Sequence, residues 1–231
     1  MTGKPAPCGR TRFKVCCISS IDEAELAITF GADAIGLVSA MPSGPGVIPD
    51  DRIEEIAATI PPGVSTFLLT SSRDMDEIIE QQRRFRMNTL QLCDEVPPAV
   101  IRELRSRLPG IAIVQVVHVV GEASLEQART AATAAHGLLL DSGNPSLEVK
   151  ELGGTGRTHD WALSRRIRDA VGAPVFLAGG LTPDNVADAV RRVRPFGVDV
   201  CSGLRTDGAL DTVKLARFVR ELKVVDRTPD H

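Results

Sequence analysis

Eight short apolar runs recur along the chain, and a more polar segment separates each run from the next. The runs read FKVCCI, DAIGLVS, VSTFLLT, TLQLC, IAIVQVVHVV, HGLLLD, APVFLAG and GVDVCSG. Near-continuous apolar runs of this length, rich in β-branched residues and bounded by turn residues, are typical of parallel strands buried on both faces. This repetition limits the possible folds more than any other feature of the chain.

The segments between the runs place apolar residues at intervals of three and four, which predicts a helix after each strand. The predicted helices cover residues 21–30, 50–60, 75–85, 97–108, 124–134, 161–170, 183–192 and 211–222. Asp50 and the Thr182-Pro183 pair suit helix starts. Eight evenly spaced units in 231 residues predict a single-domain (β/α)₈ TIM barrel over 12–223. A doubly wound open sheet is the structural alternative.

The net charge and the lengths of the apolar runs argue against nucleic-acid and membrane partners. The net charge of -3, with both signs scattered, gives no basic surface for nucleic acid or an anionic membrane. No apolar run reaches membrane-spanning length, and the start of the chain lacks the apolar stretch of a signal peptide. We expect a cytoplasmic monomer or homodimer, with a disordered or extended segment at 1–11 and a tail at 224–231.

The five cysteines lie at positions 8, 16, 17, 93 and 201, without a CxxC pair. This spacing argues against a disulfide framework and against a ready-made zinc site. Cys16, Cys93 and Cys201 fall at predicted strand ends, so a metal cluster is conceivable, but buried reduced thiols are the preferred interpretation. We therefore expect no metal and no cofactor.

Three glycine-rich turns follow the last predicted strands and read ELGGTGRT, LAGGLTPDN and CSGLRTDG. Glycine lets the backbone approach a ligand closely, and a following helix N-terminus favours an anion. Barrels frequently bind phosphate at the loops after strands 7 and 8. The predicted phosphate-binding residues are Gly154, Gly156, Gly179, Gly180, Ser202 and Gly203.

The motifs KVCCIS, GADAIGLV, LLLDS, GGTGRTHDW, PVFLAGGLTPDNV and RPFGVDVCSG together resemble the phosphoribosylanthranilate isomerase family of tryptophan biosynthesis. The similarity extends over about residues 12–223, in register with all eight units. The resemblance implies a TIM barrel that performs an Amadori rearrangement, which needs one acid and one base on opposite sides of a small sugar.

The resemblance also implies roles for two residues. The family's base is a cysteine in a Lys-(Ile/Val)-Cys-Gly motif, which matches Cys16, and its acid is an aspartate matching Asp141. Cys17 then occupies the family's glycine position. A cysteine base needs nearby positive potential, but strand geometry places Lys14 about 6–7 Å from Cys16, so the sequence does not assign Lys14 this role. Asp141 must be buried or lie near an anion to keep its proton.

The residues expected around the aglycone depart from the family. The loop after the second strand usually carries an arginine for the anthranilate carboxylate, whereas MPSGPGVIP here has no basic residue. Cys93 and Asp94 replace His-Gly, and Arg205 introduces a new positive charge. We assign these three residues to the aglycone side, with Arg205 as a possible substitute for the missing arginine.

The function predicted from the sequence is an aldose-ketose isomerase that acts on a phosphoribosylamine, by default N-(5'-phosphoribosyl)anthranilate. One alternative is the same chemistry on a different aglycone. Another is a non-catalytic phosphosugar-binding homologue, although it would have no need to retain both Cys16 and Asp141. An epimerase or aldolase ranks lower, because it would normally need a metal-binding set or a Schiff-base lysine at a strand end.

Overall fold

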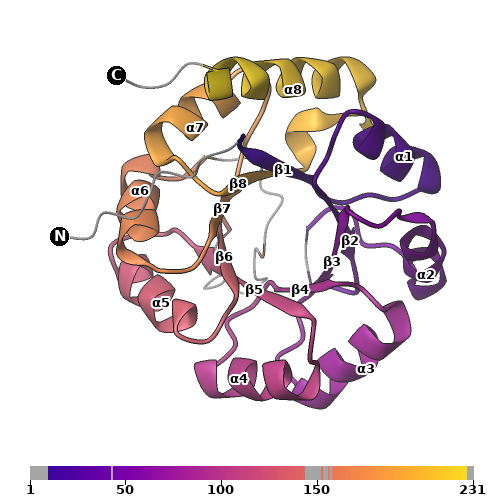
Figure 1. Ribbon diagram of the computed structural model, residues 1–231, viewed down its shortest axis with the longest axis vertical. Coiled ribbons are helices and arrows are strands. Elements are labelled where there is room, and N and C mark those ends of the chain that lie inside the picture. The colour runs from indigo at the N-terminus through magenta and orange to yellow at the C-terminus, as the bar shows by residue number, and fades with distance from the viewer. Residues whose placement is uncertain (1–9, 43, 144–151, 153–155, 157, 228–231) are drawn as a thin grey trace.

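The chain folds as a closed barrel with its helices on the outside (Figure 1). The computed structural model describes residues 10–42, 44–143, 152, 156 and 158–227. Within these residues, eight parallel strands pair in chain order and β8 pairs with β1. The predicted (β/α)₈ barrel is confirmed, and the open sheet is wrong because its edge strands would stay unpaired.

The strands are β1 (Arg12–Val15), β2 (Ala34–Val38), β3 (Ser65–Thr70), β4 (Thr89–Leu92), β5 (Ala112–His118), β6 (Gly137–Asp141), β7 (Val175–Leu177) and β8 (Gly197–Val200). The helices are α1 (Ile21–Thr29), α2 (Asp50–Thr59), α3 (Met75–Phe85), α4 (Pro98–Arg107), α5 (Ala123–Ala132), α6 (Trp161–Ala170), α7 (Val186–Val193) and α8 (Thr212–Arg227). None of the described helices combines the length and apolar character needed to cross a bilayer.

Side chains alternate along each strand between two separate apolar layers. In β1, Phe13 and Val15 pack outward against the helices, whereas Cys16, just after the strand, belongs to a second cluster inside the barrel. Phe67 of β3 and Val114 of β5 belong to the same inner cluster. Both faces of every strand are therefore buried, which explains the continuous apolar runs in the sequence.

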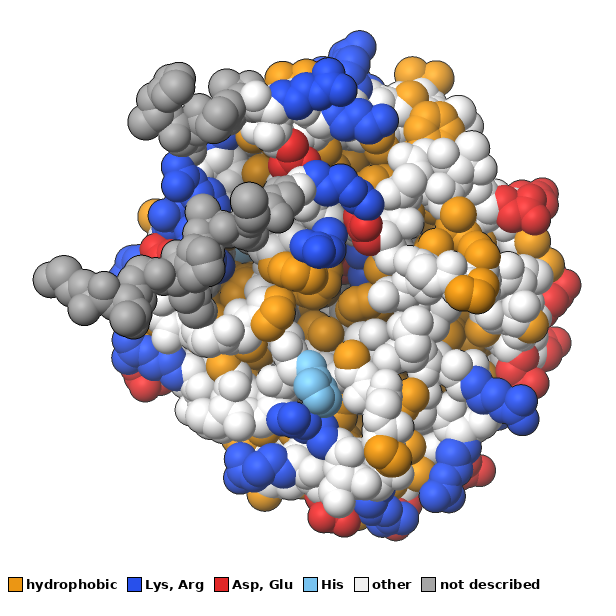
Figure 2. All heavy atoms as spheres, in the orientation of Figure 1, with side chains coloured by type: hydrophobic (Ala, Val, Ile, Leu, Met, Phe, Trp, Pro, Cys, Tyr) orange, Lys and Arg blue, Asp and Glu red, His pale blue; other side chains and the backbone are white. Residues whose placement is uncertain are grey.

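Aromatic rings fill the inside of the barrel. Phe176 packs edge-on against Phe67 and Phe196, with ring centroids 6.0 Å and 5.3 Å apart, and the Arg12 guanidinium lies 4.3 Å from the Phe196 centroid. Figure 2 shows apolar side chains gathered over the middle of one end of the barrel, with charged side chains around the rim. The barrel is thus a packed core and not a channel.

A buried ion pair lies inside this apolar surrounding. Lys14 Nζ lies 2.8 Å from Asp199 Oδ1 and 5.3 Å from the Phe67 ring centroid, and the Lys14 side chain is completely buried. Burial alone would lower the pKa of Lys14, but Asp199 and the thiols of Cys16 and Cys17 raise it overall. Lys14 therefore stays a cation inside the barrel.

The helix predicted from Pro183 begins three residues later, at Val186. Asn185 is the reason, because its Oδ1 accepts a hydrogen bond from the Thr182 N–H group at 2.8 Å. The side chain of Asn185 closes a turn at the position where the sequence predicted the first helical turn.

A short hairpin follows β8 that the sequence analysis did not predict. The 3₁₀ turn Ser202–Leu204 leads into β9 (Arg205–Thr206), which pairs with the antiparallel β10 (Ala209–Leu210). Asp207 and Gly208 join the two strands with φ angles of 50° and 83°. An Asp-Gly pair is a strong signal for a hairpin turn. The sequence prediction treated this segment only as a glycine-rich turn for phosphate and overlooked that signal.

The barrel extends past its predicted limits at 12 and 223. Helix α8 continues to Arg227, and its Asp226 accepts hydrogen bonds from Thr11 N at 3.0 and 2.9 Å. Arg10 pairs with Asp33 across two bonds of 2.8 and 2.5 Å. Residues that the sequence assigned to the two tails therefore tie the ends of the chain to the barrel.

Removing the Lys14 charge should destabilise the barrel. Lys14→Met leaves the Asp199 carboxylate buried without a partner, so we expect the free energy of unfolding to fall by about 3–5 kcal/mol in urea titrations. The double variant Lys14→Met/Asp199→Asn should lose clearly less, because it buries no unpaired charge. Equal losses in the two variants would mean that the ion pair does not account for the effect.

Candidate functional site

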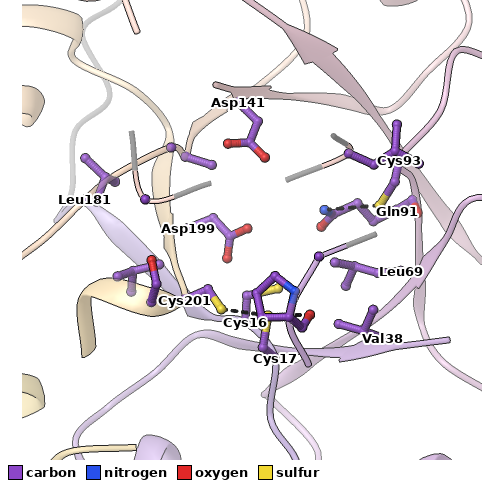
Figure 3. A pocket seen from close by; sticks show the side chains of 18 of the residues that line it. Cys16, Cys17, Val38, Leu69, Gln91, Cys93, Asp141, Leu181, Asp199 and Cys201 are labelled. Carbon is purple, nitrogen blue, oxygen red and sulfur yellow. Dashed lines mark hydrogen bonds between the residues drawn. The ribbon is translucent and has the colours of Figure 1, made fainter. Parts of the chain in front are cut away.

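The carboxyl ends of the strands surround a pocket with about 650 Å³ of empty space, part of it open to solvent. Figure 3 looks into this pocket; the strands follow one another counterclockwise there and clockwise in Figure 1, so the two figures view opposite ends of the barrel. The predicted site residues that line it are Cys16, Cys93, Asp141, Gly156, Gly179, Gly180 and Ser202. Gly154 lies outside the described residues.

Cys16 stands directly after β1, where its N–H group donates to Val200 O of β8 at 2.9 Å. A Cβ atom added to Gly36, on the neighbouring β2, would lie 3.0 Å from both Cys16 Sγ and Lys14 Nζ. The thiol and the buried ammonium are therefore neighbours, and their charges interact. The strand spacing alone did not show how close the Lys14 ammonium comes to the Cys16 thiol. The long side chain of Lys14 extends along the barrel interior, in the space that Gly36 leaves free.

Asp141 lies at the end of β6, on the opposite side of the pocket from Cys16 (Figure 3). Burial raises the pKa of Asp141 above its ordinary value, and the nearby Asp199 carboxylate acts in the same direction. The Ser142 N–H group, 2.7 Å from Oδ1, and His118 oppose this shift. The environment thus favours a protonated carboxyl, which is what the predicted acid requires.

The glycines after β7 adopt backbone angles that suit glycine. Gly179 and Gly180 have φ angles of 79° and 62°, and a Cβ on Gly179 would lie 2.9 Å from Ser142 Oγ. Within the described part of the chain, no acceptor takes the N–H group of either glycine. Two adjacent donors at a barrel mouth, without an acceptor among the described residues, form a suitable cradle for an anion.

The three glycine-rich loops meet on this side of the pocket. A Cβ on Gly203 would lie 1.9 Å from Leu181 O, so the loop after β8 packs directly on the loop after β7. A Cβ on Gly156 would lie 3.8 Å from Ser202 Oγ, which brings the loop after β6 beside them. The three turns predicted to bind phosphate are therefore brought together, although Gly203 does not line the pocket itself.

The other side of the pocket is more apolar. Val38 and Leu69 line it, together with Gln91 and Cys93 (Figure 3). Within the described residues the Gln91 Oε1 atom is buried without a hydrogen-bond partner, and its Nε2 atom lies 3.9 Å from Cys93 Sγ. No Lys or Arg is among the described residues that line the pocket.

Arg205 does not face this pocket, which corrects its assignment to the aglycone side. Its guanidinium pairs with Glu23 at 2.7 and 3.0 Å and donates to Cys17 O at 2.5 Å and Gly208 O at 2.7 Å. These contacts engage both terminal nitrogens, so Arg205 connects the hairpin to the turn after β1. Asp94 does not line the pocket either, and its Oδ1 accepts the Glu95 N–H group at 2.8 Å.

Three further polar residues contribute to the site. Lys14, Gln91 and Asp199 all point into the barrel, and the last two line the pocket. Strand alternation was the available signal, because Lys14 is two residues from Cys16 and Gln91 two residues from Cys93. Among the described residues, no group of three or more His, Cys, Asp or Glu side chains is placed to hold a metal ion.

Comparisons with known proteins agree with this geometry. Residues 13–221 match the family model described as N-(5'phosphoribosyl)anthranilate (PRA) isomerase. A relative from Haloferax volcanii, named N-(5'-phosphoribosyl)anthranilate isomerase, is 40% identical over 203 residues, which cover 87% of each chain.

Solved structures give the same result. A phosphoribosyl anthranilate isomerase from Thermotoga maritima superimposes with a TM-score of 0.80 and 30% identity, over 93% of this chain and 99% of that one. Another crystal structure contains such an isomerase in complex with reduced 1-(o-carboxyphenylamino)-1-deoxyribulose 5-phosphate. It superimposes with a TM-score of 0.78 and 28% identity over the same shares of the two chains.

The raised pKa of Asp141 has a consequence for stability. The pKa of the Asp141 carboxyl is higher in the folded state than its ordinary value of 3.8. As the pH rises between the two pKa values, the unfolded state gives up this proton more readily than the folded state. The free energy of unfolding therefore falls in this pH range and stays lower above it. Asp141→Asn removes this penalty, so at neutral pH it should melt about 2–4 °C higher. Thermal scans should show the difference shrinking toward pH 4; a variant that melts lower at neutral pH would contradict the assignment.

Proposed function

This chain belongs to the N-(5'-phosphoribosyl)anthranilate isomerase family, and on that premise we propose that it converts N-(5'-phosphoribosyl)anthranilate into its 1-deoxyketose in tryptophan biosynthesis. The observation that carries the proposal is the placement of Cys16 and Asp141 across one pocket (Figure 3). An Amadori rearrangement needs such an opposed acid and base.

Asp141 acts first in the proposed mechanism, as the general acid. Its carboxyl proton passes to the ribose ring oxygen while the bond from C1' to that oxygen breaks, and the lone pair of the substrate's nitrogen forms an iminium. Burial, which raises the pKa of Asp141, keeps the proton available for this step. The substrate's own nitrogen accepts the positive charge that develops.

Cys16 acts second, as the general base. Its thiolate removes the C2' proton, and the electrons of that C–H bond neutralise the iminium to give an enolamine, which tautomerises to the ketose. The Lys14 ammonium supplies the positive potential that a thiolate needs. Asp199 holds that ammonium in place from the other side, through the 2.8 Å bond.

The two sides of the pocket suit the two ends of the substrate. The N–H groups of Gly179 and Gly180, which no described acceptor takes, suit the 5'-phosphate. Val38 and Leu69 offer apolar contact for the aromatic ring, and the Gln91 amide is a neutral polar group near the position expected for its carboxylate. Cys93 lies beside Gln91 on this side.

The names of the relatives favour anthranilate as the aglycone over a different one. The retained acid and base favour an enzyme over a non-catalytic phosphosugar-binding protein. A cytoplasmic location and a monomeric or homodimeric state stay predictions, as does the absence of a nucleic-acid or membrane partner.

A coupled fluorescence assay tests the proposal. N-(5'-phosphoribosyl)anthranilate is generated in situ, and its disappearance is followed with the unchanged chain, Cys16→Ala and Asp141→Asn. We expect turnover by the unchanged chain and a loss of at least about a hundredfold in each variant, because general acid–base groups contribute that much.

Binding of reduced 1-(o-carboxyphenylamino)-1-deoxyribulose 5-phosphate is the control, and both variants should retain it. Undiminished turnover in one variant would remove that residue from the mechanism. If the unchanged chain has no turnover while a control isomerase is active in the same cuvette, the assignment of the substrate is wrong.

A further inference from the structure

Two thiols at the pocket mouth lie in direct contact. Cys17 follows the catalytic thiol at the end of β1, and Cys201 follows the neighbouring strand β8. Their sulfur atoms are 2.7 Å apart, yet both residues are free cysteines (Figure 3). Both line the pocket, and the proposed mechanism uses neither.

The backbone holds Cys17 in an unusual conformation. Its φ angle is 60°, a left-handed conformation that non-glycine residues adopt infrequently. The position corresponds to a glycine in the motif of the family that the sequence resembles. The Arg205 guanidinium binds Cys17 O, and Cys17 Sγ lies 3.5 Å from Pro45 O. These contacts keep the Cys17 side chain directed at Cys201.

We propose that Cys17 and Cys201 form a redox-active dithiol that a peroxide converts reversibly into a disulfide, and that this modification lowers the isomerase activity. The formation of the disulfide is independent of the substrate. Its effect on turnover rests on the proposed function.

The surroundings assign different roles to the two thiols. The hydrogen bond between the two thiols and the positive charge of Arg205 lower the pKa of Cys201, although burial opposes them. Hydrogen bonds with Cys16 and Cys201, together with burial, raise the pKa of Cys17. Cys201 is also the more exposed of the two. Cys201 is therefore the thiol that reacts with the oxidant, and Cys17 is the thiol that resolves the product.

The reaction has two balanced steps. The Cys201 thiolate attacks one peroxide oxygen, the O–O bond breaks, and the departing hydroxide takes up a proton to leave as water, which leaves a sulfenic acid on Cys201. The Cys17 sulfur then attacks the Cys201 sulfur, the S–O bond breaks, and a second water leaves with the Cys17 proton. In total the two thiols lose two protons and two electrons, and hydrogen peroxide becomes two molecules of water.

The disulfide would act on both sides of the pocket. A disulfide bond is about 2.05 Å long, so the sulfur atoms have to approach one another from their present 2.7 Å. Cys17 is covalently attached to Cys16, and Cys201 to Ser202 in the loop after β8. The bond therefore pulls the base and the phosphate side toward each other, and small displacements of this kind are costly for turnover.

The experiment uses the full chain with Cys8→Ser, which leaves four thiols. The protein is treated with hydrogen peroxide, and its intact mass, free-thiol count and turnover are measured. We expect the loss of two hydrogen atoms and two thiols, and a fall in turnover of about tenfold or more, reversed by dithiothreitol. After trypsin digestion, the non-reduced sample should contain peptides 15–52 and 193–205 joined together.

Three further variants identify the sulfur atoms. Cys17→Gly, which suits the φ of 60°, and Cys201→Ser should both lose the joined peptides, whereas Cys16→Ala should keep them. Joined peptides in Cys17→Gly, or four free thiols after peroxide treatment of the Cys8→Ser chain, would overturn the proposal. A disulfide without an effect on turnover would overturn its regulatory part. If the reduced protein has no turnover, the proposed function is wrong instead. The intact mass and the joined peptides still show whether Cys17 and Cys201 form the disulfide.

Discussion

The buried ion pair between Lys14 and Asp199 is the interaction on which the site depends. It places a positive and a negative charge beside an inner cluster made mostly of phenylalanine, aliphatic and cysteine side chains. The ammonium lies beside the Cys16 thiol, and the two groups interact electrostatically. The carboxylate acts on Asp141, whose pKa it helps to raise. The Lys14 charge lowers that pKa, so the two charges of the pair act on Asp141 in opposite directions, and burial is the main cause of its raised pKa.

The pocket has two chemically different sides around these charges. The loop after β7 offers the N–H groups of Gly179 and Gly180 on one side, and only residues without a Cβ fit the close contacts of Gly179 and Gly203. The other side offers apolar walls and a neutral amide from Gln91, with no cation among the described lining residues. An uncharged partner for the aglycone carboxylate would bind it less strongly than a bidentate arginine. The thiols of Cys17 and Cys201 lie where β1 and β8 meet, beside Cys16.

The sequence predicted much of this arrangement, because apolar periodicity reports directly on burial. It predicted the barrel, the convergence of the glycine turns and the positions of Cys16 and Asp141 at strand ends. The sequence could not predict the directions in which the long side chains point. Arg205, expected at the aglycone, binds Glu23 because the Asp207-Gly208 hairpin turns it away. The Lys14 side chain lies near Cys16 in the space beside Gly36, where a Cβ atom would crowd both groups. The order of residues along the chain does not show such a contact between neighbouring strands.

The most direct test of this account is the alkylation rate of Cys16 by iodoacetamide at neutral pH, read from the peptide that carries it. A Cys17→Gly background leaves Cys16 as the one thiol in that peptide. Adding Lys14→Met/Asp199→Asn removes the buried ammonium without leaving an unpaired charge, and circular dichroism confirms that the barrel is folded. The account predicts alkylation slower by about tenfold or more. An unchanged rate would contradict it, because the thiolate would then not depend on Lys14.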